Sequence, residues 1–486
     1  MKPSLKVRPA IALVAVWLGA SLLLALSGPP AETHSFDADF TGRTMRVDYF
    51  HSGTATEEHI SLDRVVADGP WPGSRTRLVD DTNFGKYLFE VTDRATNRLL
   101  YSRGFSSVYG EWETTGEAKK VWRTFQESLR FPWPKRPVQV TLKKRDSENV
   151  FREVWATAVD PNSRFVTPAD SALRGRVWTV FENGPPSEKV DLLVLGDGYT
   201  AAEMEKFHSD VTRLIAALFE EEAFRSRKAD FNVRAMDLAS AESGVSRPHA
   251  GVFRRSALST HYSSFDSERY LLTYDNRTLR DVASAAPYDF LIILVNERTY
   301  GGGGIFNDQT IAAADNAYAV YLLVHEFGHN FGGLGDEYFT SDVAYETGAA
   351  EKPEPWEPNL TALRDPPNLK WKDLVEPATP LPTPWDKEAF EKDSRAIQER
   401  RRKLRASGAP EAEMEKLFRE QEAAETRLLA GMKYSGKVGA FEGAGYETKG
   451  LYRPRTDCIM FSRDKVGFCP VCRRAIARVI DLYSRK

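Results

Sequence analysis

The segment His325-Glu326-Phe327-Gly328-His329 constrains the fold of this chain more than any other feature. Residues 318–324 before it contain neither Pro nor Gly and are apolar at helical spacing, so we expect the motif on a buried helix. Side chains four residues apart share one helix face, with Cβ atoms about 5–6 Å apart. Two imidazoles on that face can reach one metal ion at about 2.0–2.1 Å, so His325 and His329 are predicted to bind zinc.

Glu326 lies between the two histidines but is rotated away from their helix face. It can therefore address a water molecule instead of the metal, and a carboxylate placed there takes a proton from a water that zinc has made more acidic. The alternative is a pair of core histidines on an amphipathic helix. The chain has only 8 His, so this spacing around a glutamate arises by chance about once in a hundred. We predict a hydrolytic zinc site with Glu326 as general base.

A third protein ligand is expected after this helix. Gly332-Gly333 is predicted to end the helix, because glycine lets the chain reverse. Asp336 is the first carboxylate after the turn and is predicted to be the third ligand, with Glu337 as the second choice. The alternative is that both acids only orient other ligands through hydrogen bonds.

The motif resembles that of the metzincins, whose pattern is His-Glu-x-x-His-x-x-Gly-x-x-His/Asp. Gly332 matches the glycine of the pattern, but Gly335 stands at the third ligand position and has no side chain. Asp336 comes one residue later. Metzincins also have a methionine turn beneath the zinc, and Met460 within Asp457-Cys-Ile-Met-Phe461 matches it.

Longer strings narrow the resemblance to the immunoglobulin A peptidase family of secreted bacterial zinc metalloendopeptidases. These strings are residues 325–338, Phe441-Glu-Gly-Ala-Gly-Tyr446, Cys458-Ile-Met460 and Phe468-Cys-Pro-Val-Cys472. The resemblance implies an N-terminal β-domain, a metzincin-like catalytic domain, zinc as cofactor and a protein or peptide as substrate. Nothing in the sequence points to immunoglobulin as the substrate of this chain.

The pattern along the chain predicts a mixed α+β and α/β protein. Residues 35–166 are predicted to form a β-sandwich-like domain, in which His51 and His59 are expected to be surface or packing residues. Residues 182–486 are predicted to form the metzincin-like catalytic domain, with buried strands alternating with helices. The runs on which these predictions rest are 44–50, 86–91, 138–142, 190–195 and 290–295.

Residues 351–430 are predicted to be an insertion in the catalytic domain. The part up to Pro384 is rich in proline and is expected to be a surface loop. Residues 386–429 are densely charged, and the turn at 407–410 divides them into two expected helices. We interpret them as a solvated helical hairpin. A substrate lid or a partner-docking arm is the alternative.

Residues 1–31 are predicted to be a signal peptide or a signal anchor. Three basic residues within the first eight precede an apolar run over 10–27, which ends in the small-x-small string Ala25-Leu26-Ser27. If the run is not cleaved, it is long enough to tether the protein to a membrane. Both cases place the remainder outside the cytoplasm, so we expect an exported protein.

Charge composition bears on the class of partner. The 66 basic and 69 acidic residues give a formal net charge of −3, which argues against a nucleic-acid-binding surface.

The competing function is an exported module that binds a surface glycan or protein and has a vestigial zinc site. Because Glu326 and both histidines are present, the sequence favours the peptidase. Hydrolysis of amides in a non-protein substrate such as peptidoglycan is a third hypothesis.

Two further features are candidates for the active site. Tyr338, Tyr446 and Tyr452 each have a hydroxyl that can stabilise a developing oxyanion, and Tyr446 is the predicted donor among them. The alternative for each of the three is a packing role. The stretch Gly301–Gly304 lets a substrate backbone approach closely or pair with a strand edge; a flexible loop is the alternative.

The three cysteines, Cys458, Cys469 and Cys472, all lie near the C-terminus. In an exported protein we expect two of them to form a disulfide, and Cys458 paired with Cys469 or Cys472 would join the methionine turn to the last helix. A second zinc site is the alternative. It lacks a fourth ligand, because no histidine lies between these cysteines or after them.

Overall fold

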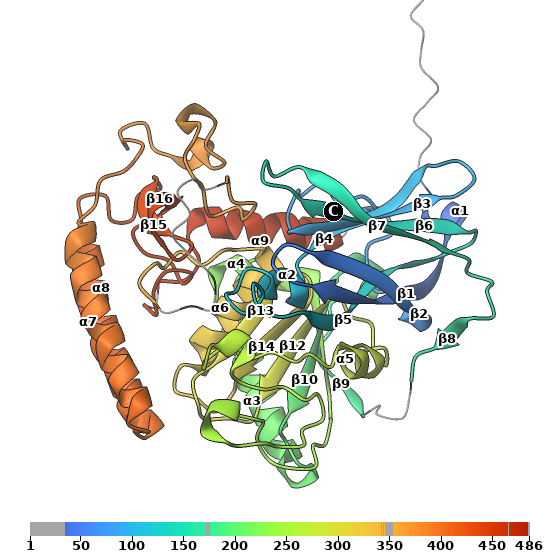
Figure 1. The fold of residues 1–486 in the computed structure, drawn as a ribbon, viewed down its shortest axis with the longest axis horizontal. Helices are drawn as coiled ribbons and strands as arrows, with labels where there is room; N and C mark the ends of the chain where they lie inside the picture. The colour runs from blue at the N-terminus through green and yellow to red at the C-terminus, as the bar shows by residue number, and fades with distance from the viewer. Residues whose placement is uncertain are drawn as a thin grey trace, which may run out of the picture. The chain divides into compact units, whose positions relative to one another are not determined.

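The structure, a computed structural model, confirms a mixed α+β fold with an N-terminal domain followed by a catalytic-like domain (Figure 1). It describes residues 35–170, 175–341, 343, 345, 353–464 and 466–484. The predicted signal segment lies outside these residues. In the part of the chain that is described, no helix is both long and apolar enough to cross a membrane.

The N-terminal domain consists of two four-stranded sheets, of order β5-β1-β2-β8 and β4-β3-β6-β7. Its strands are β1 (Phe40–Gly53), β2 (Glu58–Pro70), β3 (Tyr87–Asp93), β4 (Leu99–Phe105), β5 (Arg123–Pro134), β6 (Val138–Arg145), β7 (Phe151–Val159) and β8 (Val166–Pro168). Its two short helices are α1 (Phe36–Asp39) and α2 (Val108–Trp112).

Alternating side chains explain why the two sheets face each other. Tyr87, Phe89 and Val91 of β3 are buried, while the residues between them are half-buried. They share one apolar core with buried residues of the other sheet such as Val47 and Leu129. The period of two places one apolar face of each sheet against the other, as in a β-sandwich.

The catalytic-like domain contains a six-stranded sheet of order β13-β14-β12-β10-β11-β9. The four inner strands are parallel, and the two edge strands β9 and β13 are antiparallel to their neighbours. The strands are β9 (Val177–Phe181), β10 (Val190–Asp197), β11 (Phe231–Met236), β12 (Phe290–Val295), β13 (Gly302–Ile305) and β14 (Gln309–Ala313). Strand β9 joins this sheet although it precedes residue 182, where the domain was expected to begin.

Helices cover both faces of this sheet. The longer elements are α3 (Met204–Leu218), α5 (Asn276–Ala283), α6 (Ala319–Gly332), α7 (Lys387–Ala406), α8 (Glu411–Ala430) and α9 (Pro470–Tyr483), with α4 (Glu222–Arg225) and the hairpin β15 (Phe441–Ala444) and β16 (Glu447–Arg453). Short 3₁₀ turns occur at Pro186–Glu188, Ala201–Glu203, Lys228–Asp230, Pro248–Ala250, Ser264–Asp266, Pro366–Asn368 and Lys372–Leu374. Helices α3, α6 and α9 share a core with one face of the sheet, and α5 packs on the other.

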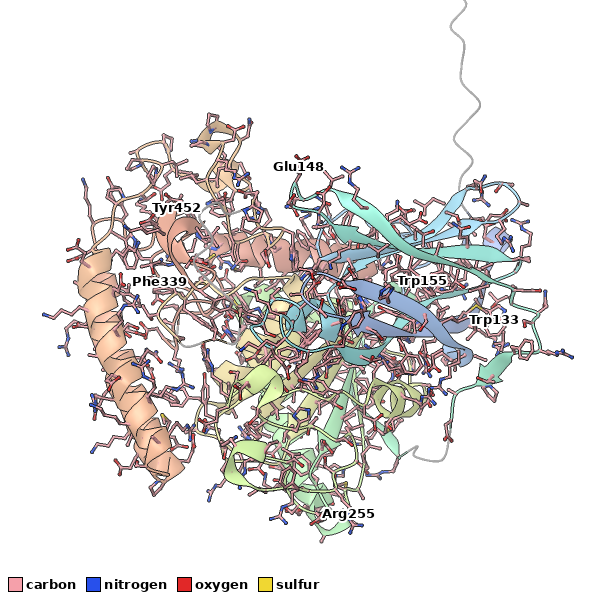
Figure 2. The ribbon with its side chains drawn as sticks, in the orientation of Figure 1. Trp133, Glu148, Trp155, Arg255, Phe339 and Tyr452 are labelled. Carbon is pink, nitrogen blue, oxygen red and sulfur yellow. The ribbon has the colours of Figure 1, made fainter. Side chains whose placement is uncertain are left out.

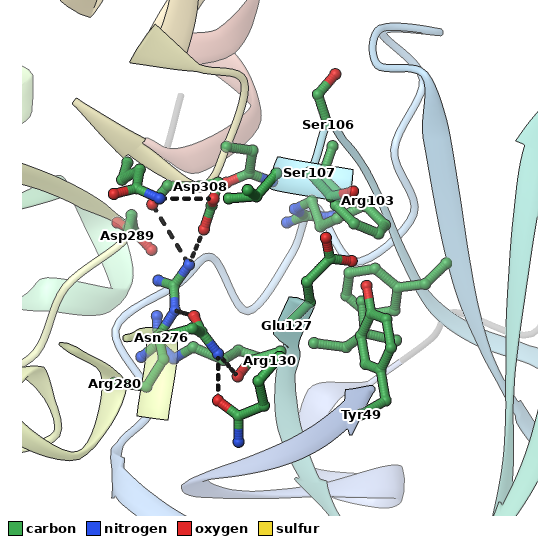
Figure 3. A pocket seen from close by; sticks show the side chains of 18 of the residues that line it. Tyr49, Arg103, Ser106, Ser107, Glu127, Arg130, Asn276, Arg280, Asp289 and Asp308 are labelled. Atoms are coloured by element: carbon green, nitrogen blue, oxygen red, sulfur yellow. Dashed lines mark hydrogen bonds and ion pairs between the residues drawn. The ribbon is translucent and has the colours of Figure 1, made fainter. Parts of the chain in front are cut away.

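Polar contacts join the N-terminal domain to the catalytic-like domain. Arg46 and Arg64 both form ion pairs with Asp281 of α5. A polar cavity of about 70 Å³ lies at the same interface, with Glu127 of β5 on one side and Arg280, paired with Asp308, on the other (Figure 3). Because these groups are buried and partnered, the two domains are in direct contact around the cavity.

The charged insertion forms the two predicted helices, α7 and α8, joined by a tight turn. It is not only a solvated hairpin. Phe418 of α8 is buried, and its ring contacts the rings of Tyr300 and Tyr318. The described part of the proline-rich segment is also partly internal, because Trp371 is fully buried and donates to the Gly439 carbonyl at 2.7 Å. Both elements therefore contribute to the core.

Candidate active site

Helix α6 brings the two predicted histidine ligands together. The Nε2 atoms of His325 and His329 lie 3.2 Å apart. The helix ends as predicted: Gly333, its C-terminal cap, has a φ of 60°, a left-handed conformation that glycine adopts without strain. This reversal directs the following residues back towards the histidines.

Asp336 completes the group of ligand atoms. Its Oδ1 lies 3.1 Å from His325 Nε2 and 3.3 Å from His329 Nε2. Atoms bound tetrahedrally to one zinc ion at about 2.0–2.2 Å are about 3.3–3.6 Å apart, so these distances fit a single ion. Oδ1 is buried and accepts no hydrogen bond from any described residue. The three side chains form a possible metal site, and metal binding itself stays a prediction.

A hydrogen bond on the outer side of each histidine ring fixes the orientation of that ring. His325 Nδ1 donates to the Ile459 carbonyl at 3.0 Å, and His329 Nδ1 donates to the Leu334 carbonyl at 2.6 Å. Both Nε2 atoms are therefore left as acceptors that face Asp336, which is the tautomer a metal ligand requires.

Tyr446 is held against the ligand group in a way that the sequence did not suggest. Its hydroxyl donates to Asp336 Oδ2 at 2.5 Å. In this structure its single proton is shared with Asp336, so the hydroxyl holds that carboxylate in place. The role of Tyr446 as an oxyanion donor stays a prediction. Tyr338 lines the same cleft. Tyr452, labelled in Figure 2, lies on β16 and is not among the residues that line the cleft.

Glu326 lies beside the histidines and faces β13. A carboxylate oxygen of Glu326 and a ring nitrogen from each of His325 and His329 lie within 4.8 Å of one another. Burial raises the pKa of Glu326, and the charges of the two histidines oppose the rise. A carboxylate with a raised pKa is suited to accept a proton and later to release it.

The glycine stretch packs against helix α6 and forms part of the cleft. A Cβ on Gly302 would lie 2.8 Å from Glu326 Oε1, and one on Gly304 would lie 2.2 Å from the Glu326 carbonyl oxygen. At Gly302 the strand edge is already occupied: its N–H donates to Arg269 O, and its carbonyl accepts from Leu271 N–H. Close packing on α6, and not an open edge at Gly302, explains these glycines.

Met460 lies where the resemblance implied. It is fully buried, and its Sδ would be 3.0 Å from a Cβ on Gly328 of the motif. Its carbonyl accepts a hydrogen bond from Glu337 N–H at 2.8 Å. The methionine turn is therefore packed directly against the helix that carries the histidines.

A cleft of about 540 Å³ opens over these residues, and its walls come from distant parts of the chain. The N-terminal domain contributes Lys86, Glu111 and Arg145, and α7 and α8 contribute Phe390, Ser394, Gln398, Gln421 and Glu425. Arg269 and Arg463 line it as well. No local sequence motif marks these wall residues, so they could not be predicted from the sequence.

The expected disulfide is absent and that prediction is wrong for this structure. Cys458, Cys469 and Cys472 are all free and buried. The Cys472 sulfur lies 3.8 Å from that of Cys458 and 3.5 Å from that of Cys469, whereas a disulfide bond is about 2.05 Å long.

Comparison with known proteins gives the family of the chain. No curated protein matches it. The sequence model described as IgA Peptidase M64 matches residues 179–480, and the one described as Peptidase M64 N-terminus matches residues 35–156. The first match covers more than half of the chain and contains the histidines, the acids and the methionine turn of the candidate site. The chain therefore belongs to the IgA Peptidase M64 family, a family of peptidases.

Proposed function

We propose that this protein is an exported zinc-dependent endopeptidase. Membership of a peptidase family supports hydrolysis of protein or peptide substrates. The observation that carries the proposal is the convergence of His325, His329 and Asp336, with inner atoms 3.1–3.3 Å apart, beside the half-buried carboxylate of Glu326. The three ligands and Glu326 have the separate roles that metal-assisted hydrolysis requires.

The donor set favours zinc. Two neutral imidazoles and one carboxylate are ligands that zinc binds readily, and three protein ligands leave a fourth position for water or substrate. When bound, zinc would polarise the scissile carbonyl and make a water molecule more acidic. The outer hydrogen bonds of His325 and His329 would hold both rings in the orientation that such binding needs.

Glu326 is the proposed general base. Its carboxylate takes the proton of the attacking water and then delivers that proton to the departing amine. Gly302 lies against this carboxylate and leaves it little freedom to turn away. Arg269 and Tyr338 line the cleft nearby, and Arg269 Nη2 donates to the Tyr338 hydroxyl at 3.2 Å. A positive charge would therefore lie beside a substrate bound in the cleft.

The test is the activity of Glu326→Gln towards a peptide library derived from a proteome. We expect the variant to retain its metal and its fold and to lose activity by several orders of magnitude. Glu220→Gln, a change at an exposed glutamate after α3, is the matched control and keeps full activity. A fully active Glu326→Gln protein would end the hypothesis.

The same library separates the competing functions. No cleavage by a wild-type protein that holds stoichiometric zinc would instead favour the binding module with a vestigial site. Cleavage of peptidoglycan fragments without cleavage of peptides would favour the third hypothesis.

Export is a proposal that rests on residues 1–31. The intact mass of the protein recovered from outside the cytoplasm decides between cleavage after residue 27 and a retained tether through residues 10–27. Recovery of the full-length chain from the cytoplasm alone would contradict it.

A further inference from the structure

A second group of ligand atoms lies in the core behind the candidate active site. The sulfur atoms of Cys458, Cys469 and Cys472 and a carboxylate oxygen of Glu337 lie within 4.8 Å of one another, and all four side chains are buried. Cys472 Sγ lies 3.8 Å from Cys458 Sγ, 3.5 Å from Cys469 Sγ and 3.4 Å from Glu337 Oε1.

These distances match the edges of a tetrahedral metal site. With zinc–sulfur bonds of about 2.3 Å and zinc–oxygen bonds of about 2.0–2.2 Å, two sulfurs lie about 3.8 Å apart and a sulfur and an oxygen about 3.5–3.7 Å apart. Each of the three measured distances lies within about 0.3 Å of these values, and both sulfur–sulfur distances are far longer than a disulfide bond.

Glu337 is the ligand that the cysteine spacing alone did not reveal, because it lies 135 residues before Cys472. Its side chain is fully buried and Oε2 has no hydrogen-bond partner among the described residues. Asn359 Nδ2 donates to Oε1 at 2.9 Å and holds the carboxylate in place. An ionised carboxylate in such a position is costly unless a cation partners it. The buried Arg453 acts on Glu337 by its charge, but among the described residues it forms no direct ion pair with this carboxylate.

The local backbone favours thiolates at this position. Cys469 is the N-terminal cap of α9, with Pro470 at the first helical position, and Cys472 lies in the first turn. The N-terminus of a helix stabilises negative charge. The Cys469 backbone N–H also donates to Cys458 Sγ at 3.3 Å. We propose that Cys458, Cys469, Cys472 and Glu337 form a second metal site that binds zinc with four protein ligands and is therefore structural.

Such a site would join three segments that position the catalytic group. Glu337 directly follows Asp336, and its backbone N–H donates to Met460 O. Cys458 directly precedes Ile459, whose carbonyl orients His325. A metal ion here would fix the loop of the third ligand, the methionine turn and the start of α9 relative to one another, and it would act on activity only through position.

Metal counting on the full chain tests the proposal in a background without peptidase activity. The protein is purified with a thiol reductant and without chelator, and zinc is measured by elemental analysis. We expect two zinc ions per wild-type chain, one in the His325→Ala/His329→Ala variant, and none after Cys472→Ser is added to it. One ion in the wild type with none in the histidine variant would overturn the proposal. In a sample purified without the reductant, a mass that is two hydrogens lower, which marks a disulfide, would overturn it too.

Two controls keep the result independent of folding. Ile459→Val changes a core residue of the same turn without removing a ligand atom and keeps both ions. The second control needs no cysteine variant. When the histidine variant is titrated with an organomercurial, one zinc ion should be released as the three thiols react. Release of no zinc would contradict the proposal.

Cobalt substitution identifies the ligands. Co²⁺ bound to the histidine variant should show thiolate-to-cobalt charge transfer in the near ultraviolet, and Glu337→Gln should keep that band but bind cobalt at least about tenfold more weakly. An absent band, or unchanged affinity in Glu337→Gln, would exclude this ligand set. Because these measurements use no substrate, they are independent of whether Glu326 catalyses hydrolysis.

Discussion

The Tyr446 hydroxyl donates to Asp336 Oδ2 at 2.5 Å, across 110 positions of sequence. A second contact supports the same geometry, because Gly445 N–H donates to the Asp336 backbone carbonyl at 2.8 Å. The β15–β16 hairpin therefore holds both the main chain and the side chain of the third proposed ligand, while Oδ1 is left to face the histidines.

Tyr446→Phe should weaken zinc binding by about 10–100-fold, because Asp336 loses the hydrogen bond that orients it. If the hydroxyl acted on the oxyanion instead, zinc affinity would be unchanged and kcat alone would fall. Competition with a chromogenic chelator measures the affinity, and activity at saturating zinc completes the comparison. Tyr452→Phe, on β16 outside the cleft, is the matched control.

Asp336→Ala should lower zinc affinity at the histidine site far more than Tyr446→Phe does, because it removes a ligand and not the group that orients it. Asp336→Asn keeps the shape of the side chain but loses its charge. Its zinc affinity should therefore lie between those of Asp336→Ala and Tyr446→Phe. Chelator competition in the Cys472→Ser background isolates this site. Wild-type affinity in Asp336→Ala would show that Asp336 is not the third ligand.

Local spacing explains which parts of the site could be predicted. His325, Glu326 and His329 lie on one helix, and Asp336 follows a glycine turn, so short-range geometry is sufficient to group them. The hydrogen-bond partner of Asp336 is Tyr446, which lies 110 residues later in the sequence. No local sequence pattern indicates a contact between residues so far apart.

The same reasoning applies to the fold. Strands β10 and β12 were predictable because parallel strands buried on both faces are continuous apolar runs. Charge pattern predicted α7 and α8 but not the burial of Phe418, because apolar residues scattered among charged ones do not show what they pack against. The disulfide was expected from the assumed compartment, whereas the spacing of Cys458 and Cys472 depends on tertiary packing that the sequence does not display.

Gly302→Ala should lower kcat while leaving the metal bound. The new Cβ would lie 2.8 Å from Glu326 Oε1, so the carboxylate must move away from the position in which it accepts a proton. We expect a loss of about 100-fold for a shift near 1 Å. Gly431→Ala is the control, because its Cβ meets only ordinary contacts at 3.6 Å. Unchanged kcat in Gly302→Ala would show that the position of Glu326 does not limit the reaction.

The N-terminal domain provides a prediction about pH. Glu58 is mostly buried: burial raises its pKa, but hydrogen bonding from His51 and the charge of Lys144 lower the pKa to about 2, from 4.5. A carboxyl with a lowered pKa stabilises the fold above pH 4.5, and this contribution is lost as the pH falls towards 2. The pKa of His51 is raised from its ordinary value of 6.5, so His51 changes its charge at a higher pH than the range in which Glu58 does. Glu58→Gln should therefore reduce the free energy of unfolding by about 2–3 kcal/mol at pH 5.5 and by much less at pH 3. Urea titrations at the two pH values measure this difference. Glu57→Gln, at an exposed neighbouring glutamate, is the control. A difference independent of pH would show that the carboxylate charge does not stabilise this domain.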